Sequence, residues 1–121
     1  MQFLLLLHAE EAGWMKLSRT EQEQAVAAYR SYTEALSKAG HLVSSNRLQP
    51  VSTATTIRVV DGKTHVQDGP YAESKEELGG YYLIDVADLD AALSWAARCP
   101  GASHGTIEVR PVWGMQAGAN A

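Results

Sequence analysis

The run of apolar residues at the start of the chain constrains the fold more than any other feature. Side chains alternate along a strand, so Phe3, Leu5 and Leu7 point to one face while Leu4 and Leu6 point to the other. Both faces of this strand are apolar, and we expect both to be covered. Helices can cover one face. Since only two helices are expected, the other face is expected to meet another sheet, for which a second subunit is one source.

Two helices have clear start signals. Ser18 and Glu21 have the spacing of a capping box, which predicts a helix that runs to about Ala39. Asp88 can cap a second helix over residues 89–98. The expected core stripes are Ala25, Tyr29, Tyr32, Leu36 and Ala39 on the first helix and Leu89, Leu93 and Ala96 on the second.

The strands complete a recognisable order. Asp61-Gly62 lies between two runs rich in β-branched residues, which is a strong signal for a β-hairpin. The order is therefore strand, helix, strand, hairpin, strand, helix, strand. It predicts an α+β, ferredoxin-like βαβ–βαβ fold with an inserted β-hairpin. The expected strands are residues 2–7, 41–48, 53–60, 63–67, 80–86 and 106–112.

Length, charge and cysteine content limit the class of protein and its expected location. A chain of 121 residues fits one domain, expected over residues 1–115, with 116–121 as a flexible tail. The net charge of -4 argues against a nucleic-acid surface. The first apolar run has no basic residue before it and is too short to span a bilayer, which argues against a signal peptide and a membrane anchor. Cys99 is the sole cysteine, so we expect a buried inert thiol and a cytoplasmic protein.

The segment from Asp68 to Tyr81, DGPYAESKEELGGY, resembles the signature loop of the DGPF family, which is part of the YCII-related proteins. The resemblance implies a sheet that packs on a second copy, as in dimeric α/β barrels, and hence a homodimer. It implies no settled activity, although the wider superfamily includes isomerases, lyases and monooxygenases that act on compact ring compounds. Further matching segments are residues 54–59, 61–63, 88–92, 95–96 and 108–112.

The resemblance also leaves two functional alternatives open. Some YCII-related proteins are proposed to use a His–Asp pair with the histidine on the first helix, where this chain has Tyr29 and Tyr32 instead. Genes of DGPF proteins often neighbour those for extracytoplasmic-function sigma factors, which implies a regulatory link. The chain is therefore expected to be a small-molecule-binding protein with such a role, or a cofactor-free acid–base enzyme, an isomerase or lyase, that acts on a small ring-derived metabolite. A purely structural dimer with no pocket is the third alternative.

Several residues could carry that chemistry. Asp68 follows a strand and precedes a Gly-Pro turn, so it is a candidate general base, or else its carboxylate holds the turn. His8, at the end of the first strand, and His104, before the last strand, are candidate partners for proton transfer. Candidate ligand-binding residues are Glu73, Lys75, Tyr81, Glu108 and Arg110. No metal site is expected, because the four histidines lack ligand spacing, and no cofactor motif is present.

Overall fold

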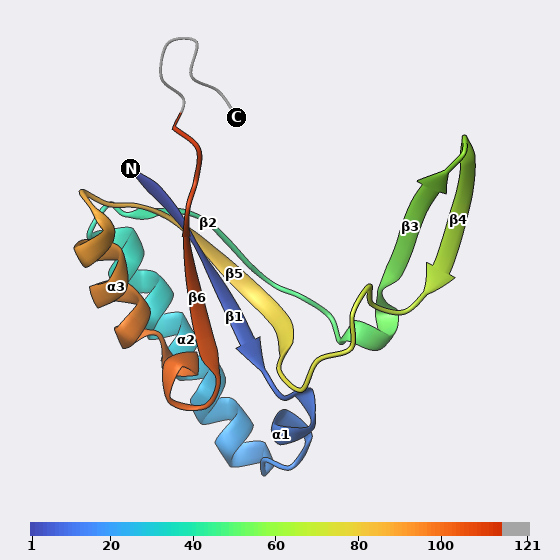
Figure 1. The fold of residues 1–121 in the computed structure, drawn as a ribbon. Coiled ribbons are helices and arrows are strands. Elements are labelled where there is room, and N and C mark those ends of the chain that lie inside the picture. Colours follow the sequence, from blue (N-terminus) through green and yellow to red (C-terminus); the bar gives the residue numbers. More distant parts are fainter. Residues whose placement is uncertain (115–121) are drawn as a thin grey trace.

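The computed structural model describes residues 1–114, so the expected tail at 116–121 lies outside the described residues. A four-stranded sheet and two long helices form the body, and a two-stranded hairpin projects from it (Figure 1). The strands are β1 (Gln2–Ala9), β2 (Leu42–Arg47), β3 (Thr55–Val60), β4 (Lys63–Asp68), β5 (Glu77–Asp85) and β6 (Thr106–Pro111). The helices are α1 (Glu11–Met15), α2 (Arg19–Lys38) and α3 (Leu89–Arg98), with short 3₁₀ turns at Val51–Thr53 and Pro100–Ser103.

The sheet confirms the ferredoxin-like topology. Its strand order is β2-β5-β1-β6, and every neighbouring pair is antiparallel. Helices α2 and α3 lie side by side on one face of the sheet, and the β3–β4 hairpin lies on the other side (Figure 1). The α+β fold with an inserted hairpin is therefore as the sequence predicts.

The core lies between the sheet and these two helices. Phe3, Leu5 and Ile84 have almost no exposed surface, and they face Leu36 of α2 and the small side chains of α3. Tyr32 packs edge-on against Tyr82 with ring centres 5.2 Å apart. The buried core residues are Phe3, Leu5, Tyr32, Leu36, Tyr82, Ile84, Val86, Ala92, Ala96 and Cys99.

Local signals in the sequence explain where the elements begin and end. Ser18 and Glu21 form the complete capping box of α2, because each side chain accepts a hydrogen bond from the other residue's backbone N–H. Gly40 follows α2 with a φ of 78°, a left-handed conformation that favours glycine. Asp88 caps α3 by accepting a hydrogen bond from the Ala91 N–H.

Three expectations about the elements were wrong. The element order expected from the sequence has no helix between the first strand and the capping box at Ser18, but this segment contains the one-turn helix α1. Strand β5 begins at Glu77, three residues earlier than expected, so part of the signature loop is strand. Ala39, Leu89 and Leu93 were expected in the core but are exposed. In α3 the core positions are Ala92 and Ala96, because a helix with alanine on every side gives only a weak signal for its buried face.

The hairpin forms as predicted, around Asp61 and Gly62, both of which have positive φ. Every side chain of β4 is exposed, and β3 has one half-buried residue, Thr56. Among the helices of residues 1–114, none is long and apolar enough to cross a lipid bilayer.

Candidate functional site

The sheet face opposite the helices carries most of the expected functional side chains. We call it the open face. Leu4 lies between Leu83 of β5 and Arg110 of β6, and in the next row Leu6 lies between Tyr81 and Glu108. Leu4, Leu6 and Leu83 are half-buried, so an apolar centre with a polar rim is in contact with water. Such a surface is typical of a binding or interaction site.

His8 and Glu108 form the closest pair of ionisable groups on the open face. The Nε2 atom of His8 lies 3.3 Å from Oε1 of Glu108. This Nε2 is buried and makes no hydrogen bond within the described residues, so the pair is at ion-pair distance without hydrogen-bond alignment. The Glu108 side chain is about half exposed. A histidine held beside a carboxylate is a common arrangement for proton transfer.

The backbone around His8 is fixed by an irregular strand and a close glycine. The pairing of β1 with β5 shifts register between Leu7 and His8, where β5 has one extra residue, Gly79. Gly105 packs directly on this segment. A Cβ atom on Gly105 would overlap the His8 carbonyl oxygen, and it would also lie 3.1 Å from the Cα of Ala9. Only glycine fits this close approach between β1 and the turn before β6.

Tyr81 brings a polarised hydroxyl to the same face. Its hydroxyl hydrogen-bonds with that of Ser44 at 3.4 Å and accepts a hydrogen bond from Asn46 Nδ2 at 2.9 Å. These bonds from Ser44 and Asn46 lower the pKa of the Tyr81 phenol. Tyr81 can therefore donate a strong hydrogen bond to a ligand lying over Leu6.

The end of the signature loop is held against the His8 end of the sheet. Lys75 Nζ lies 3.5 Å from Oε1 of Glu10, which directly follows β1. Thr106 donates a hydrogen bond to Glu76 Oε1 at 2.7 Å. Lys75 therefore has a structural partner, and an exposed pair of this kind contributes about 0–1 kcal/mol to stability.

Asp68 does not join this group within one chain. It is the last residue of β4, at the base of the hairpin, and it is exposed. Its carboxylate makes no hydrogen bond within the described residues. The turn is held instead by Gly69 N–H, which donates to the Ala54 carbonyl oxygen at 2.7 Å, and by the hydroxyl of Thr56, which donates to the Gly69 carbonyl.

Two other candidates also have no partner in the structure. Glu73 is exposed in the loop and makes no ion pair within residues 1–114. His104 is exposed beside Gly105, at the same end of the sheet as His8. The structure thus brings His8, Tyr81, Glu108 and Arg110 to one face, with Lys75 at its edge, and leaves Asp68, Glu73 and His104 apart from them.

Sequence reasoning missed three contributors to this site. Ser44 and Asn46 orient Tyr81, and Glu76 binds Thr106. The alternation of Ser44 and Asn46 along a strand was a usable signal, because it places both side chains on one face. The contact of Glu76 depends on the path of the loop and had no local signal.

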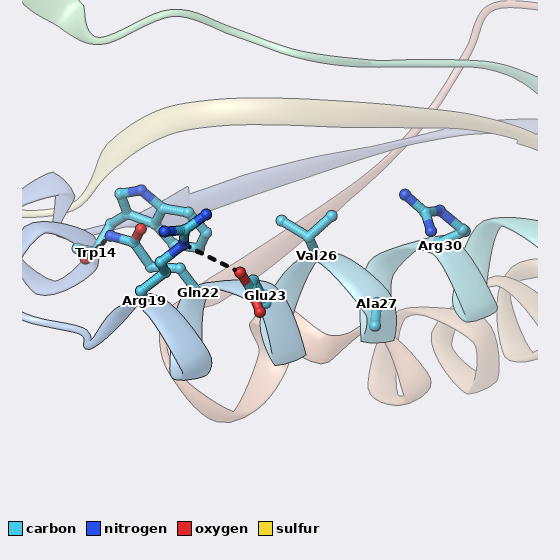
Figure 2. Close-up of a pocket in the computed structure, with 7 residues that line it drawn as sticks. All are labelled: Trp14, Arg19, Gln22, Glu23, Val26, Ala27 and Arg30. Atoms are coloured by element: carbon cyan, nitrogen blue, oxygen red, sulfur yellow. Dashed lines mark hydrogen bonds and ion pairs between the residues drawn. The ribbon is translucent and has the colours of Figure 1, made fainter.

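A surface hollow in the described part of the chain lies away from these residues. Its volume is about 460 Å³, and its lining residues come from α1 and α2. Figure 2 shows these residues, with Trp14 at one end and Arg30 at the other. Arg19 pairs with Glu23 at 3.3 Å, and the guanidinium of Arg47 stacks on Trp14 at 4.6 Å. Two of its three charged lining residues pair with each other, and no candidate residue lines it, so we do not place the site there. The lining residues are Trp14, Arg19, Gln22, Glu23, Val26, Ala27 and Arg30.

No metal centre accompanies the open face in the part of the chain that the structure describes. Among residues 1–114, no three His, Cys, Asp or Glu side chains are placed to hold a metal ion. Cys99 is buried as expected, and burial raises the pKa of its thiol, so it is a poor nucleophile.

Comparison with known proteins identifies the family. The model of the YCII-related domain matches residues 1–116. The chain belongs to the YCII-related family. An uncharacterised protein of Rhizobium meliloti is 41% identical over 118 residues, which cover 93% of this chain and 92% of that protein. The expected membership of the YCII-related proteins is thereby confirmed.

A solved structure supports the fold of this YCII-related protein. The 5-chloro-2-hydroxyhydroquinone dehydrochlorinase (TftG) of Burkholderia phenoliruptrix, in complex with 2,5-dihydroxybenzoquinone, superposes with a TM-score of 0.55 over 100% of both chains. The sequences are 14% identical, so the likeness concerns the fold alone.

Proposed function

We propose that this YCII-related protein is a cofactor-independent acid–base enzyme, of the isomerase or lyase type, whose site is the open face. One observation carries the proposal: His8 lies 3.3 Å from Glu108 on a sheet surface that is apolar at its centre and polar at its rim. General acid–base catalysis by a positioned side chain contributes about 10²–10⁴ to a rate, and histidine is its commonest agent. In this role Glu108 holds and stabilises the imidazolium, and His8 transfers the proton.

The rim of the open face suggests the class of ligand. Arg110 is exposed and makes no ion pair within residues 1–114, so its guanidinium can bind a carboxylate or an enolate. Tyr81 can donate a hydrogen bond from the opposite strand, and the leucines between them suit a flat apolar ring. A compact ring compound with acidic substituents fits these groups. The ring ligand named for the structural relative belongs to the same chemical class.

A flat sheet cannot enclose such a ligand alone, so the proposal includes a second copy. Two copies stacked by their open faces would form a barrel, place Leu4, Leu6 and Leu83 in a shared core, and leave a polar space near His8. This is the homodimer that the signature-loop resemblance implies.

The proposal is tested with 2,5-dihydroxybenzoquinone as the probe. Proton exchange at its ring carbons in D₂O requires protonation and deprotonation of the carbon, and proton NMR follows the loss of the ring signal. Wild-type protein should accelerate the exchange, and His8→Gln or Glu108→Gln should reduce the acceleration by about 10²-fold or more. His65→Gln, on an exposed strand of the hairpin, is the matched control and should exchange as wild type does.

The other outcomes are informative. Binding measured by calorimetry without accelerated exchange would contradict the enzyme and favour a binding module of the regulatory type. Equal rates in wild type and His8→Gln would remove His8 from the chemistry. Absence of binding would show that the ligand class is wrong.

A further inference from the structure

The β3–β4 hairpin has one apolar face that its own chain leaves uncovered. Strand pairing puts Ile57 opposite Val66, with Val59 next to them on the same face. These three side chains are 64%, 64% and 66% exposed. A two-stranded hairpin is at best marginally stable in water without further packing. Packing of another surface on this face would therefore stabilise the hairpin.

The opposite face of the hairpin is different in character. It carries Arg58, His65 and Lys63, and it is contacted by its own loop. The guanidinium of Arg58 lies 5.7 Å from the centre of the Tyr71 ring, and the Thr56 hydroxyl binds the Gly69 carbonyl. The hairpin is thus amphipathic. Its polar face is contacted by its own chain, and its apolar face is exposed and can contact a partner.

The surface area of the chain is large enough for a partner contact of standard size. The chain exposes 8725 Å², whereas a compact monomer of 13.1 kDa exposes about 6,400 Å². The excess is about 2,300 Å², of which residues 115–121 account for at most about 900 Å², the surface of an unfolded chain of their mass. What remains exceeds the roughly 800 Å² that each partner contributes to a standard interface.

One occupant can cover both uncovered surfaces. The hairpin projects on the side of the sheet away from α2 and α3, which is the side of the open face (Figure 1). A six-residue strand extends about 20 Å, enough to reach past a molecule seated on that face. We infer that the occupant is a second copy of this chain, and that each copy clasps the other with its hairpin, laying Ile57, Val59 and Val66 against it.

The clasp also changes where Asp68 acts. Asp68 pairs with Thr55 on the same face of the hairpin as Ile57 and Val66. When that face contacts the partner, the Asp68 carboxylate lies at the dimer interface. This accounts for its position apart from His8 within one chain. The clasp deepens the proposed function, since the homodimer is part of it, but the hairpin can fail as a clasp while the sheets still stack.

The test uses two neighbouring valines on opposite faces of the hairpin. Val59→Lys places a charge on the apolar face, and Val60→Lys places the same charge on the polar face. Sedimentation equilibrium measures the dimer dissociation constant of each full-length protein. Val59→Lys should raise it about tenfold or more, as loss of a buried interface contact does, whereas Val60→Lys should change it by less than about threefold.

Each result has a distinct meaning. A wild-type protein that is monomeric at micromolar concentration would overturn both the clasp and the stacking of the sheets. A wild-type dimer that responds equally to both lysines would overturn the clasp alone.

A second variant, a chain without the hairpin, tests the clasp if Val59→Lys does not fold. Gly69 N–H binds the Ala54 carbonyl, so the two ends of the hairpin are adjacent and two glycines can replace residues 55–68. This chain should fold, as judged by circular dichroism, and should dimerise about tenfold more weakly or worse. Undiminished dimerisation of the shortened chain would also overturn the clasp.

Discussion

Leu83 and Ile84 are neighbours on β5 that point to opposite faces of the sheet. Truncating each to alanine shows whether the open face is exposed, as in a monomer, or covered, as in a stacked dimer. Ile84 is 0% exposed in the core. Ile84→Ala removes three carbons, worth about 0.8 kcal/mol each, and leaves a cavity, so it should cost about 3–4 kcal/mol. Leu83 is half-buried, so Leu83→Ala should cost only about 1 kcal/mol if the chain is a monomer. In a stacked dimer Leu83 is buried, and the loss of unfolding free energy caused by Leu83→Ala should approach that caused by Ile84→Ala.

Urea unfolding followed by circular dichroism measures these costs. For a dimer, raising the protein from about 1 µM to about 100 µM adds about 2.7 kcal/mol to the free energy of unfolding, so the midpoint rises with concentration. We expect this rise in the wild type and a cost of Leu83→Ala well above 1 kcal/mol. If Ile84→Ala does not fold, Ile84→Val should still cost about 0.5–1.5 kcal/mol. The reasoning is refuted if the midpoints are independent of concentration and Leu83→Ala costs about 1 kcal/mol.

Two further predictions concern single residues. Gly105→Ala should force the end of β1 away from the turn before β6. It should lower the free energy of unfolding by about 1–3 kcal/mol, seen as a lower urea midpoint, and slow the proton exchange of the probe. An unchanged midpoint would contradict the close approach to His8. Burial raises the pKa of Tyr29 from 10.0 to about 12, so the unfolded chain ionises first and the free energy of unfolding should fall between pH 10 and 12. Tyr29→Phe should flatten that fall, whereas the exposed Tyr71→Phe should not.

The fold was largely predictable because its signals are local. The capping box at Ser18 and Glu21, the cap at Asp88 and the turn at Asp61-Gly62 all form as their sequences indicate. The misplaced core stripe of α3 has a physical cause. Helix α3 has alanines on all of its sides, so its sequence does not show which side is buried. Packing against the sheet buries Ala92 and Ala96 and leaves the two leucines exposed.

The candidate site was only partly predictable, for reasons of geometry. Glu108 and His8 were separate candidates in the sequence, and the pairing of β1 with β6 brings them to one face of the sheet. The position of Asp68 depends on the direction in which the hairpin leaves the sheet, which no local pattern encodes. The bonds to Tyr81 depend on the register of β2 with β5, which is irregular between Leu42 and Ser44.

The central claim is that the open face is covered by a second copy. Its most direct test is the relaxation of leucine methyl groups by a soluble gadolinium chelate, measured by NMR. The methyls of Leu4, Leu6 and Leu83 should relax as slowly as those of the buried Leu5 and Leu36. Relaxation as fast as that of Leu48 and Leu89, which are 43% and 49% exposed, would show that water reaches this face and would contradict the account.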